Sequence, residues 1–280
     1  MRFCCVTPCL DAEKHIERTM LSVLGQAALE NAEHSLHYVI QDGGSKDRTV
    51  EIIESIVKEY VDHPNIELAY QSEPDSGMYD ALAKGFQYLP GGDIYSYINA
   101  GDIYENDGFQ IVAQIFEEPG VHFLTGKNCW YNESGKMTHC FLPSGYNRNL
   151  VQKGFYGTIL PFIQQESTFW DNTAHQLISY DELRECKYAG DFYLWTRFIE
   201  KMTLYIVDAR LGGFNIHEGQ LSAIYFSSYL AEMKSLSIKP LFIDYIHAYI
   251  LRIWEYFPGA IKKMISDSIV ECDSNTGESV

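Results

Sequence analysis

Short apolar runs alternate with longer segments of helical periodicity along the first part of the chain. Four runs have the composition of buried β-strands, and they cover residues 3–7, 37–41, 66–71 and 94–98. The segment between the first two runs carries one apolar helical stripe, formed by Ile16, Met20, Val23 and Leu24. A stripe of this kind covers one face of a sheet. Alternating strands and helices are typical of a parallel sheet, so we predict an open α/β fold.

Two further segments repeat the helical pattern. The second stripe is formed by Val50, Ile53, Val57 and Tyr60. The third and most regular stripe is formed by Met78, Ala81, Leu82, Gly85, Phe86 and Leu89. Beyond about residue 120 the pattern weakens, with a predicted hairpin turn at 132–135, and helical periodicity returns from Tyr225.

These changes of pattern divide the chain into segments. Residues 1–224 are predicted to form the main α/β domain, with a first half at 1–118 and a second half at 119–224. Residues 225–271 are predicted to form a C-terminal helical segment. Residues 272–280 contain no large apolar side chain except the terminal valine, which is typical of a frayed tail.

The composition narrows the range of partners. The chain has 280 residues, of which 46% are hydrophobic, enough for one large or two modest domains. Its 21 Lys and Arg residues oppose 38 Asp and Glu residues, which gives a net charge of −17. Because a phosphate backbone mainly attracts cationic surfaces, we expect no nucleic-acid partner.

The seven cysteines are odd in number and none is spaced as CxxC, so we expect reduced thiols and neither a zinc ribbon nor a disulfide framework. No cationic segment followed by an apolar stretch opens the chain, and no apolar run approaches the ~18 residues of a membrane span. We therefore expect a soluble cytoplasmic protein.

Three aspartates follow predicted strands. They are Asp42, Asp75 and Asp102. In open α/β sheets ligands bind beyond the carboxyl ends of the strands, so these side chains are expected at one edge. For each one alone, a turn or a helix N-cap is the better explanation. Together they indicate a divalent cation that holds a diphosphate.

The loop at 42–47, with the sequence DGGSKD, opens the second helix. Its glycines allow backbone N–H groups to approach a ligand, although a plain turn explains them equally well. The loop has neither the GxxxxGK[ST] pattern nor GxGxxG, which removes the main support for an ATPase or a dehydrogenase.

Several segments then resemble glycosyltransferase family 2 in order and spacing. They are CCVTPCLDAEKHIERTMLSVLGQ, VIQDGGSKDRTVEIIES, SEPDSGMYDALAKGF, YINAGDIY, IQQESTFW, YAGDFYLWTRF and LGGFNIHEGQLS. The resemblance covers about residues 1–225. It implies the GT-A fold, in which a nucleotide-binding sheet merges with an acceptor-binding half. It also implies transfer of a sugar from a nucleotide diphosphate donor with inversion at the anomeric carbon.

The resemblance assigns the donor site. Thr7, Pro8 and Asp42 resemble the residues that contact the base, with a preference for UDP or GDP. Asp75 and Lys84 resemble further nucleotide-binding residues. A cation at Lys84 would relieve the acidic crevice, and a lysine on a helix surface is the equally plausible alternative.

The resemblance also implies a divalent metal, Mn or Mg. Asp102 resembles the last aspartate of the DxD motif, and His217 resembles a histidine that completes metal coordination. Here the motif departs from its common form, because Asn99 and Gly101 stand where carboxylates often occur. With fewer carboxylates, the metal is expected to bind weakly without nucleotide.

Asp191 resembles the catalytic base of the family. The apolar residues after it would shield the carboxylate and raise its proton affinity, and an N-cap role is compatible with this. Glu166 is the alternative base, or it orders sugar hydroxyls. Gly190 and Trp195 are assigned with Glu166 to the donor or acceptor sugar.

The leading hypothesis is an inverting glycosyltransferase in the synthesis of cell-surface polysaccharide or glycolipid. Two alternatives remain. A sugar nucleotidyltransferase would carry a Gly-rich, cationic loop after the first strand, and TPCLDAEKHI lacks one. A nucleotide-sugar-binding protein without turnover would need no base at the acceptor side.

The segment at 238–265 suggests a further contact. Its four cations, Lys239, Arg252, Lys262 and Lys263, oppose only Asp244 and Glu255. Six aromatic residues accompany them. This composition fits helices that rest at a membrane interface beside a lipid-linked acceptor, at the cytoplasmic face. Packing on the main domain or a homodimer contact explains it as well.

Overall fold

The computed structural model describes residues 1–30, 33–216, 220 and 224–271. All four predicted runs form strands of one large sheet. They are β1 (Arg2–Cys9), β2 (Ser35–Asp42), β3 (Ile66–Ser72) and β4 (Ile94–Tyr97). β1 lies between β2 and β4 and is parallel to both, and β3 is parallel to β2. The predicted parallel α/β arrangement is therefore confirmed.

Later segments of the chain extend the sheet beyond β4, on the side away from β1. It contributes β6 (Phe123–Thr125), β9 (Thr168–Asp171), β10 (Tyr205–Val207) and β12 (Ile269–Val270). The strand order is β12-β10-β6-β9-β4-β1-β2-β3. β9 is antiparallel to both its neighbours, whereas the other pairs are parallel. The sheet is thus mostly parallel, as in the GT-A fold.

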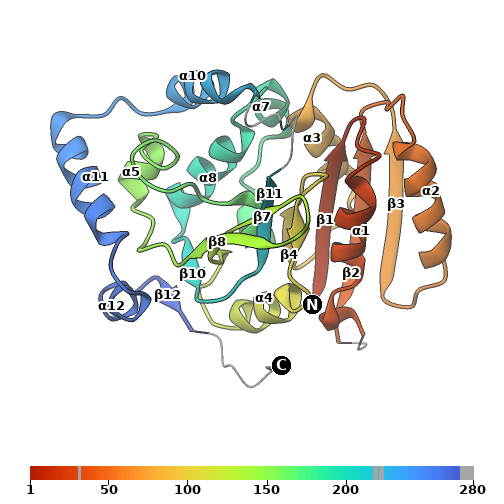
Figure 1. Cartoon of the computed structure of the whole chain (residues 1–280), viewed down its shortest axis with the longest axis horizontal. Coiled ribbons are helices and arrows are strands. Elements are labelled where there is room, and N and C mark those ends of the chain that lie inside the picture. Colours follow the sequence, from red (N-terminus) through yellow and green to blue (C-terminus); the bar gives the residue numbers. More distant parts are fainter. Residues whose placement is uncertain (31–32, 217–219, 221–223, 272–280) are drawn as a thin grey trace.

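Helices cover both faces of this sheet (Figure 1). One face carries α1 (Ile16–Leu24), α2 (Thr49–Tyr60) and α4 (Gly108–Phe116). The other carries α3 (Met78–Tyr88), α5 (Arg148–Gln152), α6 (Asn172–His175), α7 (Tyr180–Glu185) and α8 (Gly190–Lys201). Successive residues of β1 alternate between the two cores, since Phe3 packs in one and Cys4 in the other.

The predicted helix faces are mostly correct. All four residues of the first stripe are buried. In α2 only Ile53 of the predicted stripe is fully buried, and Val50, Val57 and Tyr60 are partly buried. Ile56, which was not predicted, is buried beside Ile53. In α3 the buried face is wider than predicted, because Tyr79 and Ala83 join it.

A second, smaller sheet has the strand order β5-β11-β7-β8. Its strands are β5 (Ile103–Tyr104), β7 (Asn128–Asn132), β8 (Met137–Phe141) and β11 (Gly212–Ile216). β7 and β8 form the hairpin predicted at 132–135. Gly135 closes its turn with a φ of 78° and an N–H donated to the Asn132 carbonyl at 2.8 Å.

The C-terminal segment is helical from residue 226, as predicted. It contains α10 (Phe226–Leu236), α11 (Phe242–Trp254) and α12 (Gly259–Ile265). It then returns to the large sheet, because β12 pairs with β10. The sequence pattern did not predict β12. Within the described part of the chain, no helix combines the length and apolar character needed to cross a bilayer. The predicted tail at 272–280 lies outside the described residues.

Candidate active site

The carboxyl ends of β1, β2 and β3 meet in register, with Cys9 opposite Asp42 and Asp42 opposite Ser72. Asp42 is fully buried there. Its Oδ2 accepts hydrogen bonds from the backbone N–H groups of Gly44 (3.1 Å) and Ser45 (3.0 Å) and from the Ser72 hydroxyl (2.6 Å). The Ser45 hydroxyl donates to Oδ1. Asp42 therefore holds the backbone of the loop at 42–47, which is called the glycine loop here, through hydrogen bonds to its carboxylate.

The loop that carries Asp75 lies directly against this glycine loop. A Cβ atom on Gly43 would be only 2.7 Å from Asp75 Oδ2, so a larger residue there would displace the Asp75 carboxylate. Burial raises the pKa of Asp75, and the charges of Asp80 and Asp42 add to the effect. The two predicted donor-site aspartates are thus brought together.

Lys84 holds the same loop from α3. Its Nζ donates to the Pro74 carbonyl at 3.2 Å and forms ion pairs with Glu73 (3.1 Å) and Asp80 (3.6 Å). The predicted cation therefore lies beside the Asp75 loop.

Thr7 and Pro8 both lie buried near the end of β1. The Thr7 hydroxyl shares a hydrogen bond of 2.8 Å with the Tyr38 hydroxyl. Both residues lie within two positions of Cys9, the register partner of Asp42.

Asp102 lies in a tight turn after β4. Gly101 has a φ of 122° in this turn. The Thr19 hydroxyl accepts a hydrogen bond from Gly101 N–H and donates one to the Asp102 carbonyl, each at 2.8 Å. The Asp102 carboxylate accepts a hydrogen bond from Asn215 N–H at 3.0 Å. Burial raises its pKa to about 7. Glycine at 101 thus allows the turn that presents Asp102.

Oxygen atoms without hydrogen-bond partners accompany Asp102. Of the buried oxygens without partners in the described residues, three belong to residues that contact Asp102 or feel its charge: Asn99 Oδ1, Asn215 Oδ1 and Glu166 Oε1. Burial raises the pKa of Glu166 well above its usual value, and the charges of Asp102 and Asp191 raise it further. Hard carboxylate and amide oxygens are the ligands that Mg and Mn prefer, so this donor set fits such an ion.

No three His, Cys, Asp or Glu side chains gather to hold a metal within the ranges that the structure describes. The predicted ligand His217 lies outside the described residues, two positions after Asn215.

Asp191 lies in the first turn of α8 and receives three hydrogen bonds. Its Oδ1 accepts from Phe192 N–H at 2.7 Å and from the Tyr79 hydroxyl at 3.4 Å. Its Oδ2 accepts from the Tyr229 hydroxyl at 3.3 Å. Burial raises the pKa of Asp191 to about 6, and these hydrogen bonds oppose the rise. The carboxylate is thus buried enough to bind a proton near neutral pH.

Two unpredicted contacts from α10 hold the start of α8. Tyr229 contacts Asp191 itself, and the Glu232 carboxylate accepts from three consecutive backbone N–H groups that precede Asp191. These donors are Lys187 (2.9 Å), Tyr188 (2.6 Å) and Ala189 (2.7 Å). Figure 1 shows α10 along the edge beside α7 and α8. The sequence contains one sign of this arrangement. Tyr229 and Glu232 are one helical turn apart, so they lie on the same face of a helix.

Gly190 and Trp195 have packing roles beside the carboxylate. A Cβ atom on Gly190 would lie 2.4 Å from the Tyr79 ring, so glycine lets Tyr79 reach Asp191. Trp195 is buried against Phe123, with ring centroids 5.5 Å apart. It also lines a small pocket with Asp191 and Tyr229.

The predicted residues thus form two groups. One group, at the ends of β1 to β3, consists of Thr7, Asp42, Asp75 and Lys84. In the other group, beyond β4, the charges of Asp102 and Asp191 both act on Glu166. Tyr79 connects them, because it follows the Asp75 loop in the chain and donates to Asp191.

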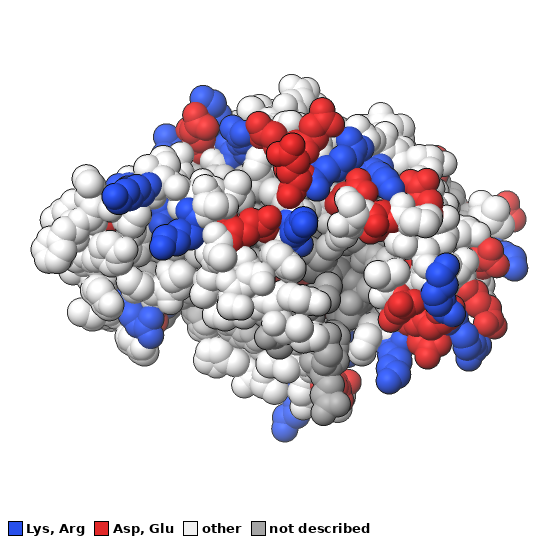
Figure 2. Space-filling model, turned by 90° about the horizontal axis from the view of Figure 1, so that it is seen from above, with Lys and Arg blue, Asp and Glu red and all other residues white. Residues whose placement is uncertain are grey.

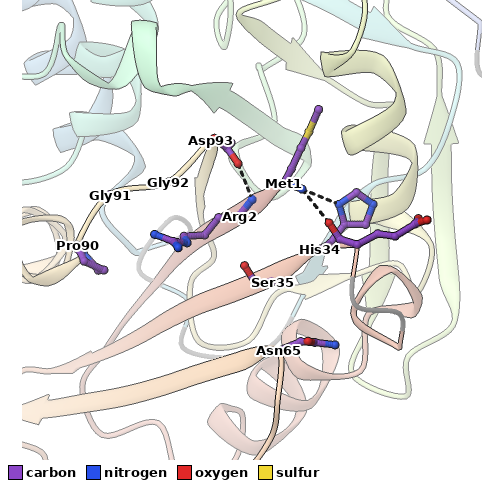
Figure 3. A pocket seen from close by; sticks show the side chains of 10 residues that line it. Met1, Arg2, His34, Ser35, Asn65, Pro90, Gly91, Gly92 and Asp93 are labelled. Atoms are coloured by element: carbon purple, nitrogen blue, oxygen red, sulfur yellow. Dashed lines mark hydrogen bonds between the residues drawn. The ribbon is translucent and has the colours of Figure 1, made fainter.

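A separate polar pocket lies at the other end of the strands (Figure 3). It is lined by the amino ends of β1 and β2, where the Met1 ammonium group donates to the Glu33 carbonyl at 3.0 Å. Asp93 accepts from Arg2 N–H there at 2.7 Å. None of the predicted site residues lines it.

The family model described as glycosyl transferase family 2 matches residues 4–164, more than half of the chain. The chain belongs to glycosyl transferase family 2. No curated protein matches it in sequence.

Solved structures share the fold of this family 2 chain at low sequence identity. S. aureus TarS 1-349 has a TM-score of 0.56 and 14% identity, and the match covers 84% of this chain but 65% of TarS 1-349. A mannosyltransferase, PcManGT from Pyrobaculum calidifontis, in complex with GDP-Man and Mn2+, has a TM-score of 0.57 and 13% identity over 91% of this chain and 69% of that one. The TarS fragment is also known in complex with UDP-GlcNAc, with 14% identity, a TM-score of 0.55, and 94% and 69% coverage.

Proposed function

We propose that this family 2 protein transfers a sugar from a nucleotide diphosphate donor to an acceptor hydroxyl, with inversion at the anomeric carbon. The observation that carries the proposal is the Asp191 carboxylate, partly buried, with its pKa raised to about 6 and oriented by Tyr79 and Tyr229. A general base works best when its pKa lies near the working pH. Asp191 has that property.

In this mechanism Asp191 removes the proton from the acceptor hydroxyl while that oxygen attacks the anomeric carbon. The bond to the diphosphate breaks in the same displacement, so no covalent enzyme intermediate forms. Glu166 is a poorer candidate, because burial and the charges of Asp102 and Asp191 raise its pKa and disfavour its charged form. We propose instead that Glu166 orders a sugar hydroxyl.

The donor nucleotide is proposed to lie over the group formed by Thr7, Pro8, Asp42, Asp75 and Lys84. Lys84 is the cation of this group and offsets part of the acidic charge around Asp75. UDP and GDP are the proposed nucleotides of the donor. They are supported by the similar structures, since TarS was solved with UDP-GlcNAc and the mannosyltransferase with GDP-Man.

Asp102 is proposed to hold a divalent metal, with oxygen atoms of Asn99, Glu166 and Asn215 near it and His217 as a further ligand. When bound, Mn or Mg stabilises the charge that develops on the leaving diphosphate. The buried oxygens without partners support this assignment. The Mn2+ in the mannosyltransferase structure agrees with it.

The decisive experiment compares Asp191→Asn with the exposed control Asp181→Asn. We expect Asp191→Asn to bind nucleotide sugar normally and to lose transfer by a factor of roughly 10² to 10⁴, the usual effect of a lost general base. The control should keep full activity. Near wild-type transfer by Asp191→Asn would overturn the assignment and require another base.

Donor hydrolysis separates this enzyme from a nucleotide-sugar-binding protein without turnover. The wild-type chain should slowly release the nucleotide diphosphate from its cognate donor without an acceptor, and Asp191→Asn should release it more slowly. Binding of the donor without any hydrolysis or transfer would favour the non-catalytic alternative.

We further propose that α11 rests on an anionic membrane surface beside a lipid-linked acceptor at the cytoplasmic face. One face of this helix is apolar and exposed, with Phe242 81%, Ile243 62%, Tyr249 57% and Ile253 62% exposed. Both acidic residues of the segment form ion pairs with lysines, Asp244 with Lys153 and Glu255 with Lys262. Lys239 and Arg252 are exposed cations.

The distribution of charge supports this orientation. Figure 2 shows that the end of the molecule with α11 is largely uncharged, with separate Lys and Arg groups, whereas acidic groups are denser over the other half. An exposed apolar helix face with nearby cations fits an anionic bilayer. An acidic second copy of the chain fits it less well.

Vesicle flotation tests the membrane proposal. The full chain should float with phosphatidylglycerol vesicles at low salt, and Phe242→Asp/Ile253→Asp should float much less while circular dichroism stays unchanged. A matched control is Tyr88→Asp at an exposed position of α3, which should float like the wild type. If the full chain does not float and ultracentrifugation shows a dimer that Phe242→Asp/Ile253→Asp abolishes, α11 is a dimer contact instead.

A further inference from the structure

Two cysteines face each other directly across the β7–β8 hairpin. Cys129 of β7 and Cys140 of β8 are register partners in this antiparallel pair. Their sulfur atoms lie 2.6 Å apart as free thiols. Neither cysteine belongs to the proposed transfer site.

The backbone geometry of this pair suits a covalent bond. Cys129 N–H donates to Gln164 Oε1 at 2.6 Å, and its carbonyl accepts from Gln164 Nε2 at 3.2 Å. Both backbone groups of Cys129 are thus bonded to Gln164 rather than to Cys140, which makes the two cysteines a non-hydrogen-bonded pair. In such pairs the Cα atoms are about 4.5 Å apart, within the range that disulfides span.

The two thiols differ in reactivity. Cys129 is buried, whereas Cys140 is partly exposed. The hydrogen bond with Cys129 lowers the pKa of Cys140 to about 7, and the charges of Lys127 and Arg210 lower it further. The same interaction raises the pKa of Cys129. Cys140 is therefore the nucleophile and Cys129 the partner thiol.

The other described cysteines lack this chemistry. Burial raises the pKa of Cys4, Cys5 and Cys186 to about 12. Cys9 is buried beside Asp42, and burial raises its pKa as well. Oxidation should therefore select Cys140 among them, because thiolates react and thiols do not.

We propose that Cys129 and Cys140 are an oxidation site that peroxides convert to an intramolecular disulfide. The Cys140 thiolate attacks one oxygen of hydrogen peroxide, the O–O bond breaks, and the other oxygen leaves as hydroxide, which gives a sulfenic acid on Cys140. The Cys129 sulfur then attacks Cys140 Sγ and water leaves, so the S–S bond forms. Two thiols are oxidised and one peroxide is reduced. A thiol reductant reverses the bond.

The test oxidises the reduced full chain with hydrogen peroxide, alkylates the remaining thiols and maps the peptides by mass spectrometry. We expect one cross-linked peptide that contains residues 129 and 140 and that dithiothreitol removes. Cys140→Ser should lose it, and the matched variant Cys186→Ser should keep it. The same oxidation in urea should give mixed links, because the register of the hairpin is lost.

Cys129→Ser provides a second measurement. Without its partner, the Cys140 sulfenic acid should persist and react with dimedone severalfold more than in the wild type. Circular dichroism checks that the variant is folded. Full alkylation of Cys140 in the peroxide-treated native wild type would overturn the proposal, as would equal dimedone labelling of wild type and Cys129→Ser.

Discussion

The Tyr229 hydroxyl lies 3.3 Å from the Asp191 carboxylate, although α10 follows α8 only after 24 intervening residues that include β10 and β11. The C-terminal segment therefore completes the surroundings of the proposed base. A second link, from Glu232 to the backbone before Asp191, fixes the same helix start. The base thus depends on a helix beyond the residues that the family model matches.

Tyr229→Phe should shift the pH dependence of transfer. The Tyr229 hydroxyl donates to the charged carboxylate and lowers its pKa, so its removal should raise that pKa above about 6. Because the base must be deprotonated, the acid limb of the kcat profile should move to higher pH, with little loss at the alkaline plateau. The exposed Tyr88→Phe should leave the profile unchanged. An unshifted limb in Tyr229→Phe would show that this contact does not act on the base.

Glu232→Ala should destabilise the protein and slow transfer. It leaves three backbone N–H groups without their acceptor, and the free energy of unfolding should fall by roughly 1–3 kcal/mol. Because the start of α8 is loosened, kcat should fall more than nucleotide affinity. Glu232→Gln keeps an acceptor oxygen and should restore part of both losses. Urea unfolding and steady-state kinetics measure the two effects.

Asp191→Asn should stabilise the protein at alkaline pH. The pKa of Asp191 is raised from 3.8 to about 6, so the folded chain binds this proton more tightly than the unfolded chain. The ionised carboxylate therefore reduces the stability as pH rises through the window from about 4 to 6. Urea titrations at pH 4 and pH 8 should show a gain for Asp191→Asn that is larger at pH 8. A gain that is larger at pH 4 would contradict the raised pKa.

Asp102→Asn and Asp42→Ala should weaken nucleotide binding in different ways. Asp102→Asn should abolish the effect of Mn on binding, because this carboxylate is assigned to the metal. Asp42→Ala should weaken binding with or without Mn, because Asp42 shapes the glycine loop through Ser45 and Ser72. Calorimetric titrations with and without a chelator measure both. Equal losses in the chelator would refute this division of roles.

Much of the fold could be predicted from the sequence, because its signals are local. The four strand runs and the stripe around Met20 were confirmed, since burial of one face follows from residue spacing alone. The short strand β12 was missed, because two residues carry no periodicity. The buried face of α2 also differs from the predicted second stripe, because Ile56 is buried more deeply than Val57.

The amino-acid sequence by itself determined the order of strands and helices and the family, because motif and period are properties of neighbouring residues. It also placed Asp42, Asp75 and Asp102 at or beyond the ends of strands. Only the tertiary structure decided which partners these groups meet. Asn215 reaches Asp102 across 113 positions, and Tyr229 reaches Asp191 across 38. Such contacts depend on strand order and helix packing, which bring together residues whose separation in the chain gives no sign of their proximity.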